Sequence, residues 1–162
     1  YKDDDLYTIK RKVPVAKGAD EDEKARSFIK QVIRARKDYK GSGNPDLYTT
    51  EDMLTSMLLL TDTTGRDLYT DESQLAKKLR VNEIITVPVM EGVKGVNGGD
   101  LMGIVCNLND YNVGADKGGA INMFEDFDID YNQEKFLIET RCSGALTKPY
   151  SAIALELDEA NS

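Results

Sequence analysis

The sequence predicts an α+β fold, on three observations. One strongly amphipathic segment near the start has the apolar spacing of a long helix. Several short runs rich in β-branched residues, such as residues 83–90 and 151–157, predict strands. The expected helices and strands do not alternate in a regular β-α-β order, so we do not expect a doubly wound parallel sheet. The 162 residues suit one domain of ordinary size.

The amphipathic segment is the clearest helix, over residues 20–40. Asp20 occupies the N-cap position and Glu23 follows three residues later, which is close to a capping box. One stripe at helical spacing is apolar or aromatic: Ala25, Phe28, Ile29, Val32, Ile33, Ala35 and Tyr39. The opposite face is basic, with Arg26, Lys30, Arg34 and Lys37. We expect the helix to end at Gly41 and Gly43.

Shorter elements precede and follow this helix. Residues 6–15 alternate loosely and include Pro14, which is typical of a short or edge strand. We expect helices over 51–60, capped by Thr50 with Leu54, Met57 and Leu58 inward, and over 72–80, capped by Asp71 with Leu75 and Leu79 inward. Further strands are expected over 46–50, 83–90, 101–108, 136–142 and 151–157, and loops over 91–100 and 109–119. Ile153, Leu155 and Leu157 share one face of the last strand.

The composition excludes several classes of function. The net charge of −8 argues against broad affinity of the whole surface for nucleic acids or membranes. The sequence has no histidine, which excludes histidine-based catalysis and histidine metal ligands. No apolar run approaches the ~18 residues of a membrane span. Cys106 and Cys142 lie in apolar stretches without a CxxC spacing, so we expect buried, free thiols, with one disulfide as the alternative.

The stretch EDFDIDYN places Asp126, Asp128 and Asp130 at every second position, as at the start of a calcium loop. Counted from Asp126, the glycine and glutamate positions of an EF-hand hold Tyr131 and Leu137, so that pattern fails. On a strand the three aspartates share one face, and the favoured interpretation is an extended segment with a solvated acidic face. A metal site and an acidic strip that meets a basic partner are the alternatives. No other group of residues suggests catalysis, so we expect neither an enzyme nor a cofactor.

Three stretches resemble the C-terminal part of major capsid proteins of tailed bacteriophages. They are RKDYKGSGNPDLYTTEDMLTSMLLLTDTTGRDLY, LAKKLRVNEIITVPVM, and DYNVGADKGGAINMFEDFDIDYNQEKFLIETRCSGALTKPYSAIALEL. The resemblance covers residues from about 20 to 157 and depends on the order of the segments rather than on a catalytic motif. It implies a tailed-phage major-capsid-type fold, with an axial domain and part of a peripheral domain that contains a long spine helix.

The resemblance also implies a division of the chain. Residues 20–43 would form the spine helix, 44–130 the axial domain, and 131–162 strands that return to the peripheral domain. Residues 1–19 would be a remnant of the extended loop or the cut edge of a longer protein, because the chain opens on YKDDD without an initiator methionine. No cross-linking pair of lysine and asparagine is assigned.

The function that the resemblance implies is that of a structural subunit of an icosahedral phage or prophage capsid. The subunit would self-assemble into hexamers and pentamers of a shell that encloses packaged double-stranded DNA, with scaffold and portal proteins as further partners and no membrane. Its location would be the virion capsid, and the bacterial host cytoplasm during assembly. Two alternatives are an encapsulin-like compartment shell and an acidic, calcium-dependent ligand-binding domain.

Within this expectation, the basic helix face has two interpretations. A solvated face is the ordinary one, because charge opposite an apolar stripe is normal on a surface helix. The other is contact with a neighbouring subunit or with the genome through Arg26, Lys30, Arg34 and Lys37. The acidic residues Asp126, Asp128 and Asp130 are the candidate counterpart.

Overall fold

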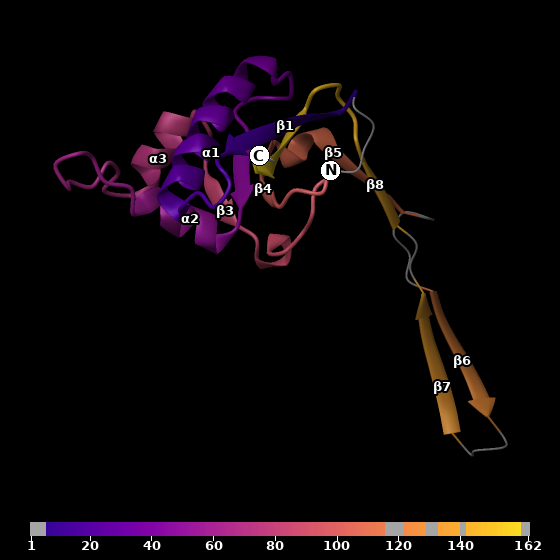
Figure 1. Cartoon of the computed structure of the whole chain (residues 1–162). Coiled ribbons are helices and arrows are strands. Elements are labelled where there is room, and N and C mark those ends of the chain that lie inside the picture. The colour runs from indigo at the N-terminus through magenta and orange to yellow at the C-terminus, as the bar shows by residue number, and fades with distance from the viewer. Residues whose placement is uncertain (1–5, 116–121, 129–132, 140–141, 160–162) are drawn as a thin grey trace.

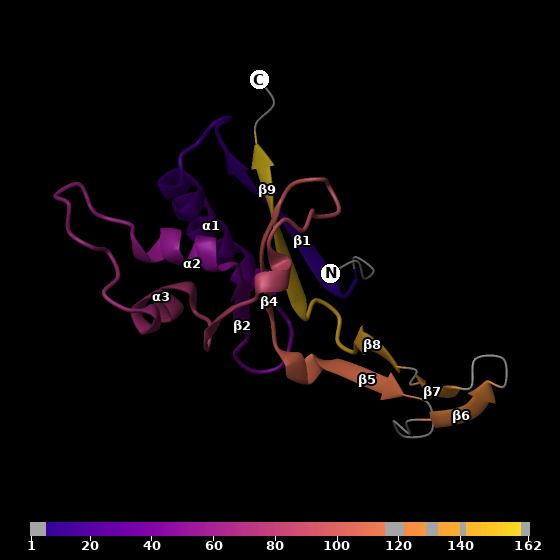
Figure 2. The same cartoon turned by 90° about the horizontal axis from the view of Figure 1, so that it is seen from below.

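The computed structural model describes residues 6–115, 122–128, 133–139 and 142–159. A five-stranded sheet with three α-helices packed on one face forms the body, and two two-stranded ribbons extend away from it (Figure 1). Figure 2, seen from below, again places all three helices on the same side of the sheet. The α+β class predicted from the sequence is confirmed.

The sheet brings together strands from both ends of the chain. Its order is β1-β9-β4-β2-β3, with bounds Thr8–Val15, Ala152–Glu159, Leu101–Cys106, Asp46–Thr49 and Ile84–Thr86. β1 runs parallel to β9, with Thr8 opposite Ala152, and β4 is antiparallel to both β9 and β2. The predicted strand over residues 6–15 therefore is a true edge strand, and Pro14 lies in it.

The helices begin at the residues that the sequence indicates. The N-cap side chains of Asp20, Thr50 and Asp71 each accept a hydrogen bond from the backbone N–H three residues later, at 2.8, 3.3 and 2.8 Å. The helices are α1, Glu21–Ala35, α2, Glu51–Leu58, and α3, Glu72–Leu79. α1 is shorter than expected, because the chain tightens into the 3₁₀ turn η1, Arg36–Asp38, and Tyr39 is extended.

The core lies between these helices and the sheet. On α1, the predicted apolar stripe is buried at Ala25, Phe28, Ile29, Val32 and Ala35 and partly buried at Ile33 and Tyr39. The sheet contributes side chains that include Leu47, Val105, Ile153 and Leu155. The predicted inward positions of α2 and α3 are confirmed, with only Leu58 partly exposed. Burial of this apolar stripe stabilises α1 more than its helix propensity does.

A β-bulge in β4 changes which residues face the helices. The pairing of β4 with β9 shifts between Leu101 and Gly103. As a result Met102 and Val105 pack in the helix-side core, whereas Leu101 and Ile104 pack in a second cluster on the opposite face. A Cβ atom on Gly103 would lie 2.8 Å from Cζ of Phe28. Only glycine therefore allows the aromatic ring to lie directly on the bulged strand.

Two predicted strands are wrong at their C-terminal ends. The strand expected over 83–90 ends at Thr86, and the 3₁₀ turn η2 occupies Pro88–Met90, because Pro88 has no N–H to continue a ladder. The strand expected over 101–108 ends at Cys106. The 3₁₀ turn η3, Leu108–Asp110, follows and leaves Leu108 exposed.

The ribbons lie outside the core. β5, Tyr111–Ala115, pairs antiparallel with β8, Cys142–Leu146, and β6, Asn122–Asp128, pairs antiparallel with β7, Gln133–Glu139. In Figure 1 the β6–β7 ribbon lies beyond the β5–β8 ribbon, far from the sheet. The predicted loop over 109–119 is therefore wrong at β5. The expected strand 136–142 is a strand at β7, and β8 continues beyond the end predicted for that strand. Every residue of β5 is exposed, so no buried face produces the alternation by which a strand is recognised.

The helix and the segment after it form one packed body. α1 contacts α2, α3, β1 and β9, so residues 20–43 share a core with residues 46–106. The division into spine helix, axial domain and returning strands stays a prediction. Its boundary after residue 130, and residues 1–5, lie outside the described residues. Among the helices of the described part of the chain, none is long and apolar enough to span a bilayer.

Candidate functional site

The basic face of α1 points to solvent. Arg26, Lys30 and Arg34 on α1 and Lys37 in η1 are all exposed. Arg26 is not entirely free, because its Nη2 donates a 2.6 Å hydrogen bond to the carbonyl oxygen of Thr61, after α2. The basic face is therefore formed as predicted along α1, but the prediction is wrong at Lys37, which lies beyond the end of the helix in η1. Arg26 also holds the turn after α2 to α1.

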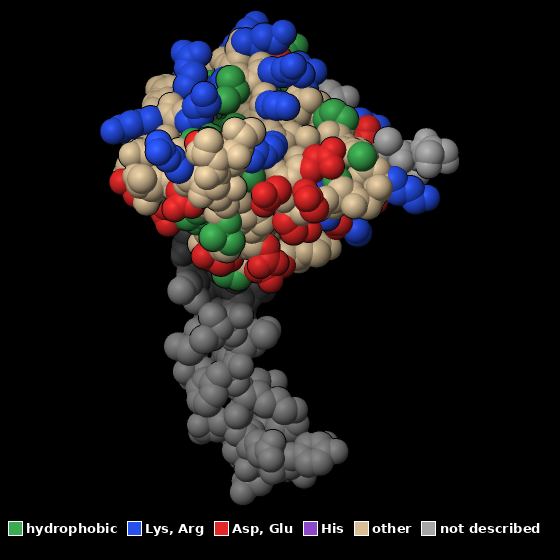
Figure 3. Space-filling model, turned by 60° about the vertical axis from the view of Figure 1, so that its left-hand side comes forward, with side chains coloured by type: hydrophobic (Ala, Val, Ile, Leu, Met, Phe, Trp, Pro, Cys, Tyr) green, Lys and Arg blue, Asp and Glu red, His purple; other side chains and the backbone are tan. Residues whose placement is uncertain are grey.

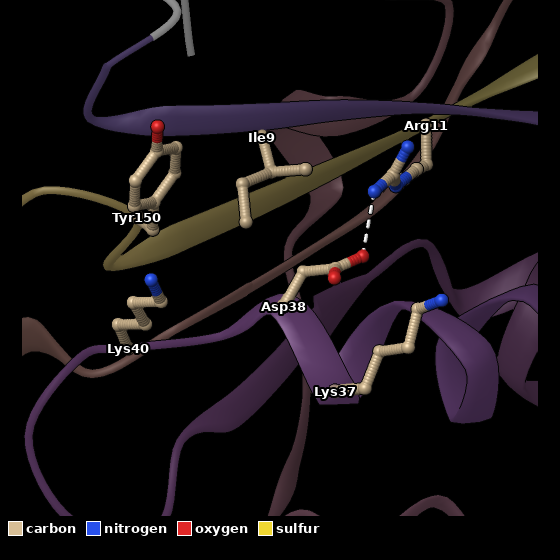
Figure 4. A pocket seen from close by; sticks show the side chains of 6 residues that line it. All are labelled: Ile9, Arg11, Lys37, Asp38, Lys40 and Tyr150. Atoms are coloured by element: carbon tan, nitrogen blue, oxygen red, sulfur yellow. Dashed lines mark hydrogen bonds and ion pairs between the residues drawn. The ribbon is translucent and has the colours of Figure 1, made fainter.

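Lys37 also borders a pocket at the C-terminal end of α1 (Figure 4). The pocket encloses about 290 Å³ between β1, η1 and the turn before β9, and its lining is Ile9, Arg11, Lys37, Asp38, Lys40 and Tyr150. Arg11 forms a 2.6 Å ion pair with Asp38. The ammonium of Lys40 lies 5.2 Å from the ring centre of Tyr150, at cation–π distance.

Sequence reasoning found only Lys37 among these six residues. The other cations, Arg11 and Lys40, come from β1 and from the segment after η1, and Tyr150 comes from the turn before β9. Tyr150 has a φ of 55°, a left-handed conformation that is uncommon for a residue with a side chain. No local pattern marks these residues, because the pairing of β1 with β9 brings them together.

The acidic strip lies on the outer ribbon. Asp126 and Asp128 are in β6, opposite Lys135 and Gln133 of β7, so the predicted extended conformation is confirmed at these two positions. Asp130 lies outside the described residues. Within the described ranges no group of three or more acidic or cysteine residues is placed to hold a metal ion. The structure therefore does not bring the acidic strip together with the basic face of α1 within one chain (Figure 1).

Asp110 links three segments at the point where the β5–β8 ribbon leaves the body. Its carboxylate is 2% exposed and accepts hydrogen bonds from the backbone N–H and the hydroxyl of Ser42, both at 2.6 Å. Lys148 lies 3.5 Å away, and the carbonyl oxygen of Asp110 accepts a hydrogen bond from the Thr147 N–H at 2.9 Å. Desolvation opposes ionisation of Asp110, but the bonds from Ser42 and the charge of Lys148 outweigh it, so its pKa lies below the usual range for aspartate.

This arrangement predicts acid sensitivity at the base of the ribbon. Because the folded-state pKa of Asp110 is depressed, its stabilising contribution is present above the unfolded-state pKa of ~3.9 and is lost as the pH falls through the folded-state value. We expect Asp110→Asn to be less stable than the wild type at pH 7, and the difference to shrink below about pH 4. Urea unfolding at a series of pH values measures it. A difference that stays constant with pH would contradict the assignment.

The two cysteines differ in exposure. Among the described residues both are free thiols, as expected, but Cys106 is only half-buried, and Cys142 is exposed. The expectation that both are buried is wrong at Cys142, because β8 lies in a ribbon without a core on either face. Desolvation by burial, aided by the nearby carboxylate of Asp46, raises the pKa of Cys106 to about 11.

We therefore expect two rates of thiol labelling. A maleimide or a disulfide reagent should modify Cys142 rapidly in the native state. It should modify Cys106 only slowly, because that thiol is half-buried and its thiolate is scarce at neutral pH. Mass spectrometry of native protein during labelling measures both rates. Cys142→Ser should remove the fast phase, and equal rates for the two thiols would contradict the structure.

The fold is similar to that of proteins in solved capsid structures. The chain resembles a protein of the capsid of an empty GTA particle, with a TM-score of 0.56 and 13% identity over 84% of this chain and 44% of that one. It also resembles the mature capsid protein of bacteriophage PhiM1, with a TM-score of 0.56 and 14% identity over 94% of this chain and 52% of that one. A virus-like particle from Pyrococcus furiosus gives a TM-score of 0.53 and 14% identity over 90% and 56%.

These similarities establish the tailed-phage major-capsid-type fold that the sequence resemblance implied. The chain spans about half the length of the capsid proteins that it matches. No protein-family model matches the sequence, and neither does any curated protein.

Proposed function

We propose that this chain is part of a structural subunit of an icosahedral phage or prophage capsid, which self-assembles into a shell around packaged double-stranded DNA. The observation on which this proposal depends is the capsid-type fold over most of the chain. The subunit has a structural role and no catalytic one. We place it in the virion capsid, and in the cytoplasm of a bacterial host during assembly.

The exposed ribbons support this role. Tyr111 and Val113 of β5 are 42% and 69% exposed, and Leu108 just before them is 60% exposed. A two-stranded ribbon without a third strand or a covering helix is marginally stable in water. Apolar residues on such a ribbon favour burial against another molecule, and in a closed shell of identical subunits that molecule is a neighbouring copy.

Expression of the full-length protein tests the proposal. Sedimentation and negative-stain electron microscopy should show closed particles, or rings of five and six subunits, with scaffold protein supplied if assembly needs it. A folded full-length protein that stays monomeric at every concentration, alone and with a scaffold protein, would contradict it. Scaffold and portal proteins are proposed as partners on the family resemblance alone.

An encapsulin-like compartment is the second candidate, and the similarity to the virus-like particle from Pyrococcus furiosus favours it. The two candidates differ in contents, because a phage shell retains DNA and a compartment retains protein. Nuclease-protected DNA in purified particles supports the phage shell, whereas co-purifying protein cargo without DNA supports the compartment.

Within the phage proposal, the basic face of α1 acts in assembly or genome contact rather than in folding. The replacement of Arg26, Lys30, Arg34 and Lys37 by glutamine should leave the melting temperature of this chain nearly unchanged, because exposed charges contribute only ~0–1 kcal/mol each. Any loss of stability should come from Arg26, because its replacement removes the hydrogen bond to the carbonyl oxygen of Thr61. In the full-length protein, the same change should lower the yield of closed shells or their retention of DNA.

Two results would decide against this role. Unfolding of the variant chain would show that the face is needed by its own domain. Shells that form and fill normally would show a solvated face and no more. The aspartates of the acidic strip, Asp126, Asp128 and Asp130, are the proposed counterpart in a neighbouring subunit, and their replacement by asparagine is the matching experiment.

A further inference from the structure

A groove at the N-terminal end of α1 has methionines in its floor and a rim on which four carboxylates outnumber one cation, Lys24. It encloses about 260 Å³ between the starts of α1 and α2 and the loop after η2. Three methionines contribute to its floor: Met53, Met90 and Met102. Four carboxylates surround it: Glu21, Asp52, Glu91 and Asp100. Methionine side chains adapt their shape readily, so such a floor suits contact with another protein surface.

Two of these carboxylates are not neutralised. Glu21 pairs with Lys24 at 2.9 Å, and Asp100 pairs with Lys94 at 2.5 Å. Asp52 and Glu91 are exposed and form no ion pair with any residue that the structure describes. The groove therefore presents net negative charge above methionine side chains that are largely buried.

The pocket at the other end of α1 has the opposite charge. Its three cations, Arg11, Lys37 and Lys40, outnumber its single carboxylate, Asp38, which Arg11 already pairs with. Lys37 and Lys40 are exposed, and the ring of Tyr150 supplies an apolar surface beside them. The net charge of the chain is −8, so a basic pocket stands out on its surface. The pocket is complementary to the acidic groove, because its charge is opposite and each of them also contains an apolar side chain.

The groove and the pocket are too far apart to meet within one molecule. Glu21 starts α1 and Lys37 follows its end, a separation of about 24 Å at 1.5 Å per helical residue. Tyr150 precedes β9 and Leu157, in the groove, lies near its end, which gives about 23 Å at 3.3 Å per strand residue. On the face that Figure 3 shows, Lys and Arg gather over the upper part of the body and Asp and Glu over the lower part, so charge is segregated on this surface.

We infer that the acidic groove of one copy receives Lys37 and Lys40 of a second copy in a head-to-tail contact. This inference rests on the proposed function and adds to it a named pair of surfaces. It assigns Lys37 to the acidic groove and leaves Arg26, Lys30 and Arg34 as the residues that would meet the acidic strip. Because the two surfaces are different, the contact is heterologous, and such contacts close into rings when the rotation between copies allows it. Rings of five and six subunits, which an icosahedral shell requires, are therefore accessible through one contact repeated around an axis. Opposite charge at the two surfaces steers the copies into this orientation and opposes the reverse one.

Charge reversal in the full-length protein tests the inference. The groove variant carries Asp52→Lys and Glu91→Lys, the pocket variant carries Lys37→Glu and Lys40→Glu, and a third variant carries all four changes. We expect each double variant to lower the yield of rings or shells at least tenfold, and the fourfold variant to regain most of it, because the charges again match. Lys77→Glu with Lys78→Glu, on exposed positions of α3, is the matched control and should assemble as the wild type does. Melting temperatures should stay within a few degrees throughout.

The outcomes separate the inference from the proposed function. Two outcomes in which wild-type shells form would show the inference wrong and leave the proposed function standing. In the first, both double variants assemble as well as the wild type. In the second, the fourfold variant assembles no better than either double variant. If the pocket variant assembles normally but loses DNA, the pocket contacts nucleic acid and the inference is also wrong. If the folded wild type forms neither rings nor shells, the proposed function itself fails.

Disulfide trapping tests the orientation independently of charge. In a Cys142→Ser background, which removes the exposed native thiol, Asp52→Cys and Lys37→Cys are placed in separate chains. A head-to-tail contact predicts cross-linked dimers only when the two chains are mixed and assembled together. Cross-links within either variant alone, or none in the mixture although it assembles, would overturn the contact.

Discussion

Phe28→Ala is expected to lower the free energy of unfolding by about 3–5 kcal/mol, the usual cost of removing a buried aromatic side chain. Phe28 is fully buried on α1, between the helices and the sheet. Its removal leaves a cavity at the centre of the interface that holds α1 on the body. Urea unfolding of the chain measures the effect. Lys30→Ala, on the exposed face of the same helix, is the control and should stay within about 0.5 kcal/mol of the wild type.

A substitution at the bulge in β4 tests the contact between Phe28 and Gly103 directly. Gly103→Ala places a methyl group 2.8 Å from the Phe28 ring and 3.1 Å from the carbonyl oxygen of Tyr48, so it should destabilise the wild type by about 1–3 kcal/mol. In a Phe28→Leu background the ring atom that clashes is absent, and the cost should fall. A double-mutant cycle measures this coupling. Additive effects of the two changes would show that Phe28 does not lie on Gly103.

The second large effect is expected at Glu156, a carboxylate that is 1% exposed in the middle of the sheet. It lies on the face of β9 away from the helices and accepts hydrogen bonds from the Val96 N–H at 2.8 Å and from the Asn97 N–H at 3.0 Å. A Cβ atom on Gly95 would overlap the carboxyl carbon of Glu156, so the loop 91–100 packs directly on this side chain. Glu156 therefore determines the conformation of that loop.

Glu156→Ala should destabilise the chain by about 1–3 kcal/mol, because the loop donors lose a charged acceptor. Val96 and Asn97 are exposed, so water replaces part of the lost bonding when the loop moves. Faster amide hydrogen exchange at Val96 and Asn97, together with urea unfolding, measures the effect. Glu159→Ala, at the exposed end of the same strand, is the control. Unchanged exchange at Val96 and Asn97 in Glu156→Ala would contradict the role of this carboxylate.

A displaced loop would also alter the acidic groove, because Glu91, Gly92 and Asp100 belong to the same segment. The proposed head-to-tail contact and the stability of the sheet are therefore linked through Glu156. In the full-length protein, we expect Glu156→Ala to lower ring or shell yield by more than its loss of stability alone accounts for.

The sequence by itself determined the local structure of this protein. The three N-caps, the apolar stripe of α1 and the shared face of Ile153, Leu155 and Leu157 are as predicted, because each depends on residues only a few positions apart. The same local patterns placed Arg26, Lys30 and Arg34 on the solvent side of α1, and Lys37 is exposed just beyond its end. The order of the segments also supported the capsid-type fold, which the structural similarities establish.

Only the tertiary structure decided what depends on residues far apart in the chain. The pairing of β1 with β9 placed Arg11 and Tyr150 beside Lys37 and Lys40, and no sequence period records such a pairing. The pairing of β5 with β8 was not predicted, because a ribbon without a buried face has no apolar alternation to detect. Cys142 is exposed for the same reason, since it lies in that ribbon. The spacing of apolar residues predicts which face of a single helix or strand is buried. Strand partners and the surfaces that they assemble are set by contacts across the whole fold.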